Sequence, residues 1–351
     1  MLRKVVIAAL AIVSLASALA TGAGAQVSFK GKTLTMLIGS EPGGGTDASG
    51  RLIARFLSKY LPGEPSIAIQ NMPGASGIVS VNHFVRRTQP DGLTVLMGSN
   101  STIDPVVYRN SAAIYDPTQI PMVGGVARGG TIIFITSAAE KRLYDKSAEP
   151  AVIGTIAGMP RVAMQPALWG VEYLGWNAKW VAGYRGTNEV MIAFDRGEVD
   201  MTSTGNIFQI QDRLNSGHLK IVNQSGTFEN GRFVRRAEFG DVPLFSDQMT
   251  GKITDPVAQK AFDYWSALAS SDKWLGLAPG TSSDILETYR DAFRKSVADK
   301  EFVELGERIS DGILPMTATE VRDVVAMLAA TPPEALEYIK GLMRKQGLRT
   351  Q

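Results

Sequence analysis

Residues 34–47 read LTMLIGSEPGGGTD, and this stretch decides the fold. Its first part, residues 34–38, is short and mostly apolar, which predicts a buried strand. The strand runs directly into a glycine-rich turn that ends at Asp47. A helix is predicted over residues 48–60, where apolar side chains recur at helical spacing.

The same plan repeats twice further along the chain. A strand at 66–70 enters the loop NMPGASG at 71–77, and a helix follows at 78–87. A third strand, 93–97, ends in the polar loop 98–102. Strands that alternate with helices predict a mostly parallel sheet, and ligands bind such sheets outside the carboxyl ends of the strands.

A second lobe is predicted after the glycine cluster at 124–130. Its expected strands lie at 131–136, 151–153, 179–182, 199–203 and 219–223, with loops at 154–159, 183–187 and 204–206. A less regular stretch follows Asp241, and a strand at 274–278 returns to the first lobe. Helices expected at 283–299, 302–309 and 319–329 close the chain. We therefore expect an α/β protein of two lobes with a ligand cleft between them. The first lobe is expected to begin with residues 26–128, and the second to consist of residues 129–243. The rest of the chain, 244–351, is expected to cross back and return to the first lobe with the C-terminal helices.

The first residues predict export. Arg3 and Lys4 precede an apolar run at 5–20, and Ala23-Gly24-Ala25 comes before Gln26. This is the layout of a signal peptide over residues 1–25, cleaved after Ala25, because the run is shorter than the roughly 20 apolar residues that span a bilayer. The chain has no cysteine, hence no disulfide and no cysteine for a lipid anchor, and we expect a soluble periplasmic protein. The net charge of +2 gives no reason to expect nucleic acid as a partner.

The glycine loops predict an anion site. A helix N-terminus leaves backbone N–H groups unpaired and carries about half a positive charge. Gly43, Gly44 and Gly45 lack the Cβ atoms that would hold a ligand away from those groups. The absence of a G-K-[ST] sequence excludes a P-loop, and contiguous glycines exclude a G-x-G-x-x-G dinucleotide turn.

Some residues in these loops have two interpretations. Asp47 and Thr46 either cap the helix or face the cleft. Arg185, beside Tyr184, either pairs with a ligand carboxylate or lies on the surface.

The sequence offers little for catalysis. His83 lies in a predicted helix among apolar neighbours and His218 lies in a turn, and neither has a second histidine or a carboxylate at a ligand spacing. No G-x-S-x-G or H-E-x-x-H motif is present. We therefore expect no enzyme activity, no cofactor and no metal.

Three motifs carry a family resemblance. The runs PGGGTD (42–47), NMPGASG (71–77) and PDGLTVL (90–96), in this order and spacing, closely resemble the Bug-type extracytoplasmic receptors of tripartite tricarboxylate transporters. Weaker matches continue at 154–158, 183–186, 197–200, 241–243 and 277–281, so the resemblance covers nearly the whole mature chain.

The resemblance implies a periplasmic-binding-protein (Venus-flytrap) fold and a ligand held by backbone amides, hydroxyls and waters. It also implies a small carboxylate ligand and membrane permease subunits as partners. We expect the protein to be a monomer. The candidate ligand-binding residues are Gly43, Gly44, Gly45, Thr46, Asp47, Gly74, Ala75, Ser76, Gly77, Ser99, Asn100, Thr155, Ala157, Gly158, Tyr184, Arg185, Gly186 and Thr204.

The sequence departs from the family pattern in the second lobe. The loop at 154–159 lacks the usual serine-rich start, Arg185 replaces a common lysine, and extra residues, Tyr264 and Trp265 among them, lie between Asp241 and Trp274. The ligand therefore stays open between a di- or tricarboxylate and an aromatic or larger acid. Two alternative functions also stay open: a ligand-sensing receptor of a two-component system, and an exported hydrolase that uses the same cleft.

Overall fold

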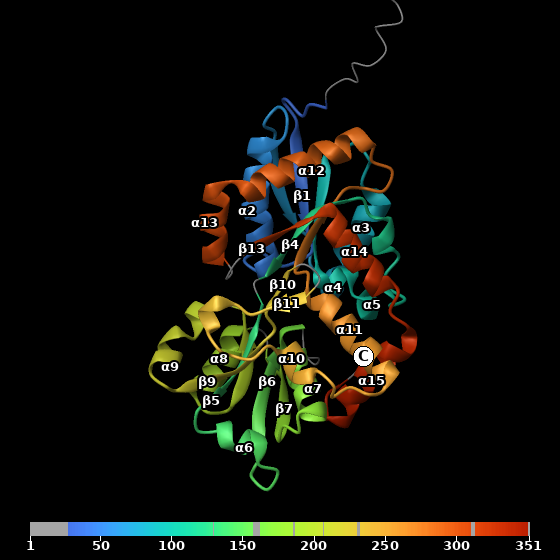
Figure 1. Cartoon of the computed structure of the whole chain (residues 1–351). Coiled ribbons are helices and arrows are strands. Elements are labelled where there is room, and N and C mark those ends of the chain that lie inside the picture. Colours follow the sequence, from blue (N-terminus) through green and yellow to red (C-terminus); the bar gives the residue numbers. More distant parts are fainter. Residues whose placement is uncertain are drawn as a thin grey trace, which may run out of the picture.

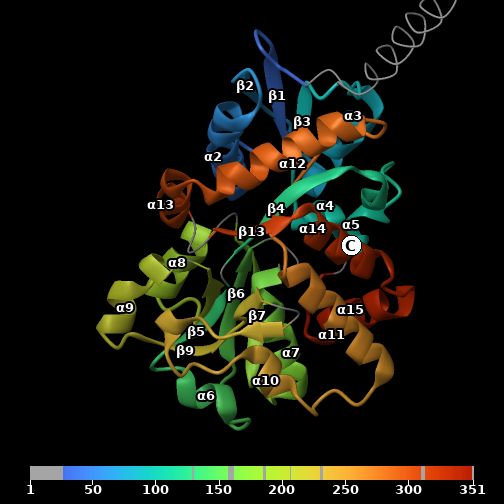
Figure 2. The ribbon, with the colours of Figure 1, turned by 45° about the horizontal axis from the view of Figure 1, so that its top comes forward.

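The computed structural model describes residues 27–128, 130–156, 162–184, 187–205, 207–229, 232–309 and 313–349. The expected signal peptide lies outside these residues. The chain forms two α/β lobes, each built on its own sheet (Figures 1 and 2). No helix in the described ranges combines the length and the apolar character needed to cross a membrane.

The first lobe contains a six-stranded sheet in the order β13-β4-β12-β3-β1-β2. Its strands are β1 (Thr33–Ile38), β2 (Ser66–Asn71), β3 (Thr94–Ser99), β4 (Met122–Arg128), β12 (Lys273–Gly276) and β13 (Ile313–Thr317). β1 pairs in parallel with β2 and β3, as predicted, but β12 is antiparallel to β3 and β4, and β13 is antiparallel to β4. Four strands run in one direction, as expected of a mostly parallel sheet, but the two strands of the returning chain run against them, so three of the five pairings are antiparallel.

The second lobe contains a five-stranded sheet in the order β7-β6-β8-β5-β9. Its strands are β5 (Ile132–Thr136), β6 (Ala151–Ile156), β7 (Ala178–Tyr184), β8 (Met201–Thr204) and β9 (Leu219–Gln224). β7, β6 and β8 are parallel, whereas β5 is antiparallel to both β8 and β9. A separate antiparallel pair consists of β10 (Thr227–Glu229) and β11 (Arg232–Val234).

Helices cover both sheets. In the first lobe and the returning chain they are α2 (Gly45–Tyr60), α3 (Ile78–Arg87), α4 (Asn100–Ile103), α5 (Pro105–Tyr108), α12 (Ser283–Ala298), α13 (Lys300–Ile309), α14 (Ala318–Ala329) and α15 (Pro333–Lys345). Those of the second lobe and the segment after it are α6 (Glu140–Tyr144), α7 (Gln165–Tyr173), α8 (Thr187–Asp195), α9 (Gln211–Asn215), α10 (Phe245–Met249) and α11 (Pro256–Ala269). Short 3-10 turns are η1 (Ala75–Gly77), η2 (Pro117–Gln119), η3 (Val162–Met164), η4 (Ile207–Gln209) and η5 (Ala237–Phe239).

Two stretches differ from their predicted structure. The expected polar loop at 98–102 is the end of β3 followed by α4, and the stretch after Asp241 that was expected to be less regular contains α10 and α11. Helix α15 was not predicted.

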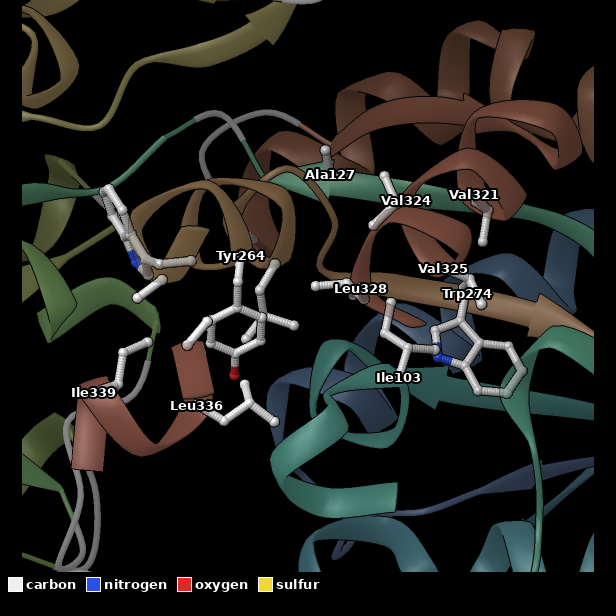
Figure 3. Packing of buried hydrophobic residues seen from close by; sticks show 14 of the residues in the cluster. Ile103, Ala127, Tyr264, Trp274, Val321, Val324, Val325, Leu328, Leu336 and Ile339 are labelled. Atoms are coloured by element: carbon white, nitrogen blue, oxygen red, sulfur yellow. The ribbon is translucent and has the colours of Figure 1, made fainter. Parts of the chain in front are cut away.

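The core of the first lobe has two halves, one on each face of its sheet. On one face α2, α12 and α13 bury Phe56, Tyr289 and Phe302. On the other face a larger cluster begins at Trp274 and α14 and continues through α11 and α15 (Figure 3). It reaches Trp169 of α7, which belongs to the second lobe. The extra residues of α11 therefore help to join the lobes.

The strand directions bring six strand ends to the junction of the lobes. β4 ends where the chain crosses into β5, and β1, β2 and β3 run in the same direction as β4, since β3 and β4 are both antiparallel to β12. β5 starts at the junction, and β6, β7 and β8 run back toward it. The carboxyl ends of β1, β2, β3, β6, β7 and β8 therefore all lie at the edges by which the two sheets face each other (Figure 1).

Candidate functional site

The N-terminus of α2 presents free N–H groups at this junction. Gly44 is the N-cap, and no side chain caps the helix, so the N–H groups of Gly45, Thr46 and Asp47 have no partner within the helix. Gly43 adopts φ +80°, a left-handed conformation that favours glycine. A Cβ on Gly44 would lie 3.3 Å from the Glu41 carbonyl oxygen and would otherwise meet only Ser40. The helix end is therefore accessible from the glycine side.

Asp47 holds this loop in place. The residue is 2% exposed, and its carboxylate accepts hydrogen bonds from the Gly43 N–H (2.9 Å), Arg51 Nε (2.8 Å) and Asn71 Nδ2 (2.8 Å). Burial raises the pKa of Asp47, but the hydrogen bonds from Arg51, Asn71 and Gly43 outweigh it and lower the pKa to about 2. Asp47 lies in the first turn and not at the N-cap, and it ties the loop after β1 to the end of β2.

The second loop has an unusual backbone. Gly74, Ala75, Ser76 and Gly77 have φ values of +133°, +46°, +56° and +96°. Ala and Ser are unfavourable in the left-handed region, and such strain is found where a structure must hold a particular geometry. Among the described residues, no hydrogen bond is made by the N–H groups of Ala75 and Ser76. These two groups are available to a ligand.

Close glycine contacts join the loops after the three parallel strands. A Cβ on Gly77 would lie 2.5 Å from Thr102 Cγ2, and one on Gly39 would lie 3.5 Å from Gly77 Cα. Ser99 ends β3 and Asn100 begins α4, and both are half-buried at the same edge. The Asn100 N–H donates to the Asp272 carbonyl oxygen (2.9 Å), and its side chain makes no hydrogen bond within the described ranges. The structure thus brings together all the first-lobe candidates.

The second lobe contributes three described candidates at the opposite edge. Thr155 near the end of β6 is 2% exposed, and its Oγ1 has no partner among the described residues. Tyr184 ends β7 and is half-buried, and burial, followed by the charge of Glu198, raises its pKa. Thr204 ends β8 and its Oγ1 donates to Gln209 Oε1 (2.7 Å). The remaining candidates, Ala157, Gly158, Arg185 and Gly186, lie outside the described residues.

Two polar residues at this junction were not predicted from the sequence. Ser40 Oγ, just after β1, is buried without a partner in the described structure, and so is Oε1 of Gln165, the first residue of α7. Ser40 could have been found as a hydroxyl next to the glycine run. Gln165 carries no such signal, since an unpaired amide becomes visible only in the packed structure.

The arrangement is suited to binding. N–H groups of the first lobe and polar side chains of the second lie at strand ends that face each other. The two histidines lie elsewhere: His83 is within α3, and His218 precedes β9 at the end away from the junction and packs against Phe194. Within the described part of the chain, no group of three or more acidic or histidine side chains could hold a metal ion.

Comparisons with known proteins give sequence relatives in Bordetella pertussis. No family model matches the chain. A UPF0065 protein of Bordetella pertussis is 25% identical over 309 residues, which cover 84% of this chain and 85% of that protein. Protein BugT of the same organism is 34% identical over 73 residues, 21% of this chain and 22% of BugT. The resemblance to Bug-type receptors is confirmed.

Solved structures share the fold. The periplasmic binding protein BugD covers 91% of this chain and 99% of its own, with a TM-score of 0.59 and 19% identity. A TctC solute binding protein from Polaromonas covers 91% and 100%, with a TM-score of 0.64 and 17% identity. MatC from Rhodopseudomonas palustris with bound malate covers 88% and 98%, with a TM-score of 0.57 and 18% identity. The predicted periplasmic-binding-protein fold is confirmed.

Proposed function

We propose that this chain is a Bug-type extracytoplasmic solute receptor that binds a small carboxylate between its two lobes and delivers it to the permease subunits of a tripartite tricarboxylate transporter. One observation carries the proposal: the uncapped N-terminus of α2 and the left-handed turn at 74–77 lie at one sheet edge, opposite the second lobe. Both offer unpaired backbone N–H groups, which bind carboxylate oxygens well.

The neutralised charges around α2 support an anionic ligand. Asp47 lies in the first turn of α2, and its carboxylate is paired with Arg51 and accepts from the Gly43 N–H and Asn71 Nδ2. A ligand carboxylate therefore meets the helix end without an unpaired negative charge from Asp47. The malate bound by the related fold of MatC is an acid of the proposed class.

Binding is proposed to act through closure of the lobes. A ligand that contacts both lobes binds the closed state better and shifts the population toward it. The crossing between β4 and β5 offers a place for the movement, and Gly130 lies there.

The remaining expectations belong to the same proposal. We propose cleavage after Ala25, residence in the periplasm, a monomeric state, no catalytic activity, and lobes divided at 26–128, 129–243 and 244–351. The loops that contain Ala157, Gly158, Arg185 and Gly186 are proposed to complete the site.

A thermal-shift screen of the chain from Gln26 tests the proposal. The ligands are mono-, di- and tricarboxylates, aromatic acids, amino acids and neutral sugars. A ligand at a hundred times its dissociation constant adds about 2.7 kcal/mol to the free energy of unfolding, which raises the melting temperature by a few degrees for a chain of this size. A shift with one class of acids is expected. A response to neutral solutes alone, or to none of the compounds, would contradict the proposal.

A further inference from the structure

We infer that the two lobes turn about the side of the molecule where helix α15 is bound to both of them, so that the cleft opens and closes on the opposite side, between α13 and α8. This inference rests on the proposed closure of the lobes and adds the position of its axis.

The C-terminal helix α15 is bound to the second lobe, although α14, the helix before it, packs on β4 of the first lobe. Gln346, which follows the last turn of α15, donates from Nε2 to the Leu168 carbonyl oxygen and accepts at Oε1 from Trp180 Nε1, each at 2.9 Å. Lys345 Nζ lies 2.7 Å from Glu172 Oε1. These contacts join the end of α15 to α7 and β7 of the second lobe.

Aromatic side chains strengthen this attachment. The ring of Tyr338 on α15 stacks on Trp169 of α7, with centroids 6.2 Å apart and planes inclined by 22°, and the Tyr338 hydroxyl bonds to that of Tyr173. Phe262 of α11 meets the fully buried Trp169 edge-on, with centroids 5.3 Å apart. Separating α15 and α11 from α7 would expose these rings to water, which is unfavourable, so we expect the contact to persist when the lobes move.

The first lobe holds the other end of α15. Arg109, just after α5, donates from Nη1 to the Thr331 carbonyl oxygen (2.9 Å) and from Nη2 to the Ala329 carbonyl oxygen (2.8 Å). These carbonyls belong to the end of α14 and to the link that leads into α15. Pro332 and Pro333 follow, and a proline fixes its own φ and restricts the residue before it. The link is therefore stiff and joins α15 firmly to the first lobe.

Helix α11 makes a second connection on the same side. It packs against α14 of the first lobe, and Tyr264 Oη donates to Asp104 Oδ1 (2.6 Å), while its Phe262 reaches Trp169 of the second lobe. Figures 1 and 2 show α11, α15 and α7 together on one side of the junction. Both helices thus tie the lobes together on that side.

Helices α13 and α8 lie on the opposite side in both views (Figures 1 and 2). α13 packs on α2 and α12, and α8 packs on β6, β7 and β8, so each helix is held by its own lobe. The ion pair of Arg55 with Glu301 (2.6 Å) also stays within the first lobe. Val303 of α13 and Ile192 of α8 are 48% and 50% exposed. Two bodies joined firmly along one side move by turning about it, so the displacement is largest at α13 and α8.

Distances between spin labels in the ligand-free protein test this inference. The chain has no cysteine, so nitroxide labels can be placed on engineered cysteines alone. One pair, Glu307→Cys on α13 and Ile192→Cys on α8, spans the side that opens. The other pair, Met327→Cys on α14 and Lys179→Cys on β7, spans the joint. All four positions are exposed.

Double electron–electron resonance measures the distance distribution of each pair. The 307–192 distribution is expected to be at least about twofold broader than the 327–179 distribution, because the turning of the lobes adds to its width. The pairs 307–327 and 179–192 are the controls, since each lies within one lobe and gives the width due to the labels themselves. Equal widths for the two spanning pairs, or a broader 327–179 distribution, would overturn the inference.

Removal of the α15 contacts gives a second measurement. Tyr338→Ala combined with Gln346→Ala is expected to broaden the 327–179 distribution, because the second lobe then loses its hold on α15. Lys340→Ala is the matched control on the same helix, since its ion pair with Glu337 (2.6 Å) lies within α15, and it is expected to leave the width unchanged. Circular dichroism checks that the variants fold, and Gln346→Ala alone takes the place of a double variant that does not. An unchanged width in the folded variant would show that α15 does not hold the joint.

Neither measurement uses a ligand, so the outcomes separate this inference from the proposed function. Narrow distributions for all pairs, together with a melting-temperature shift by an acid, would overturn the axis and the closure but leave the receptor function standing. The expected widths without a response to any acid would support the axis and contradict the proposed ligand class.

Discussion

The Asp47 carboxylate joins three segments of the first lobe: the loop after β1, the first turns of α2 and the end of β2. Its pKa of about 2 in the folded state is below the ordinary value of 3.8, so the carboxylate stabilises the protein at pH values above 3.8. This stabilisation is lost as the pH falls from about 4 toward 2. The difference corresponds to roughly 2 kcal/mol.

Asp47→Asn is therefore expected to lower the free energy of unfolding by roughly 2 kcal/mol at pH 7 and by much less at pH 2.5. Urea unfolding at both pH values measures this. Glu301→Gln is the control, because the Arg55–Glu301 pair is exposed on both sides and contributes little. A cost for Asp47→Asn that is equal at the two pH values would show that its ionisation is not what stabilises the loop.

At this scale the sequence predicts part of the site. The glycine runs at 43–45 and 74–77 and the polar strand ends were found because their residue types mark tight turns at strand ends. Ser40 and Gln165 were not found, since an unpaired hydroxyl or amide is a property of packing. The role of Asp47 also needed the structure, because its partner Asn71 is distant in sequence.

Helix α11 connects the lobes at the element scale. Its Tyr264 Oη donates to Oδ1 of Asp104 (2.6 Å), the residue that caps α5 in the first lobe. Burial raises the pKa of Asp104 to about 6, although the hydrogen bonds from Tyr264 and the Val106 N–H act against the rise. Because this folded-state pKa is above 3.8, the protonated Asp104 carboxyl makes its full contribution to the free energy of unfolding below about pH 4. That contribution is lost as the pH rises through 6.

Tyr264→Phe is expected to cost more at pH 7.5 than at pH 5. At the higher pH it leaves a half-buried carboxylate with the Val106 N–H but without the Tyr264 hydroxyl, at a cost of about 1.5–3 kcal/mol. At pH 5 the protonated carboxyl loses only a neutral hydrogen bond of about 1 kcal/mol. Thermal or urea unfolding at both pH values measures the difference. Tyr289→Phe is the control. The Tyr289 hydroxyl donates to the neutral Gly92 carbonyl oxygen (2.6 Å), so the cost of removing it is expected to be independent of pH. The same independence in Tyr264→Phe would contradict the account.

Most helices were predicted, but α11 and α15 were not. The buried residues of α11 recur at helical spacing and Asp255 caps the helix, so its signals were present in the sequence and were overlooked. α15 begins at Pro333 with Glu334 in its first turn, a start signal that was overlooked after Pro332. The antiparallel directions of β12 and β13 depend on pairings across long separations, which local patterns do not show.

The two-lobed arrangement of the whole molecule follows from one simple cause. Each lobe repeats strand, loop and helix. After the crossing from β4, strand β5 runs away from the junction, and β8, which is antiparallel to β5, runs back toward it. The carboxyl ends of the parallel strands in both sheets thereby lie at one junction. The repeating pattern predicted two lobes from sequence alone, whereas the apolar cluster from Trp274 to Trp169 that spans them required the structure.

Calorimetric titration of one acid identified in the screen into wild type and Gly44→Val tests the central claim most directly. Gly44 has φ −74° and ψ 163°, which valine adopts readily, so the ligand-free fold and its melting temperature are expected to persist. The valine side chain would cover the free N–H groups of α2. We predict that wild type binds the acid and that Gly44→Val does not. Equal affinities in the two proteins would contradict the claim that this helix end holds the ligand's carboxylate.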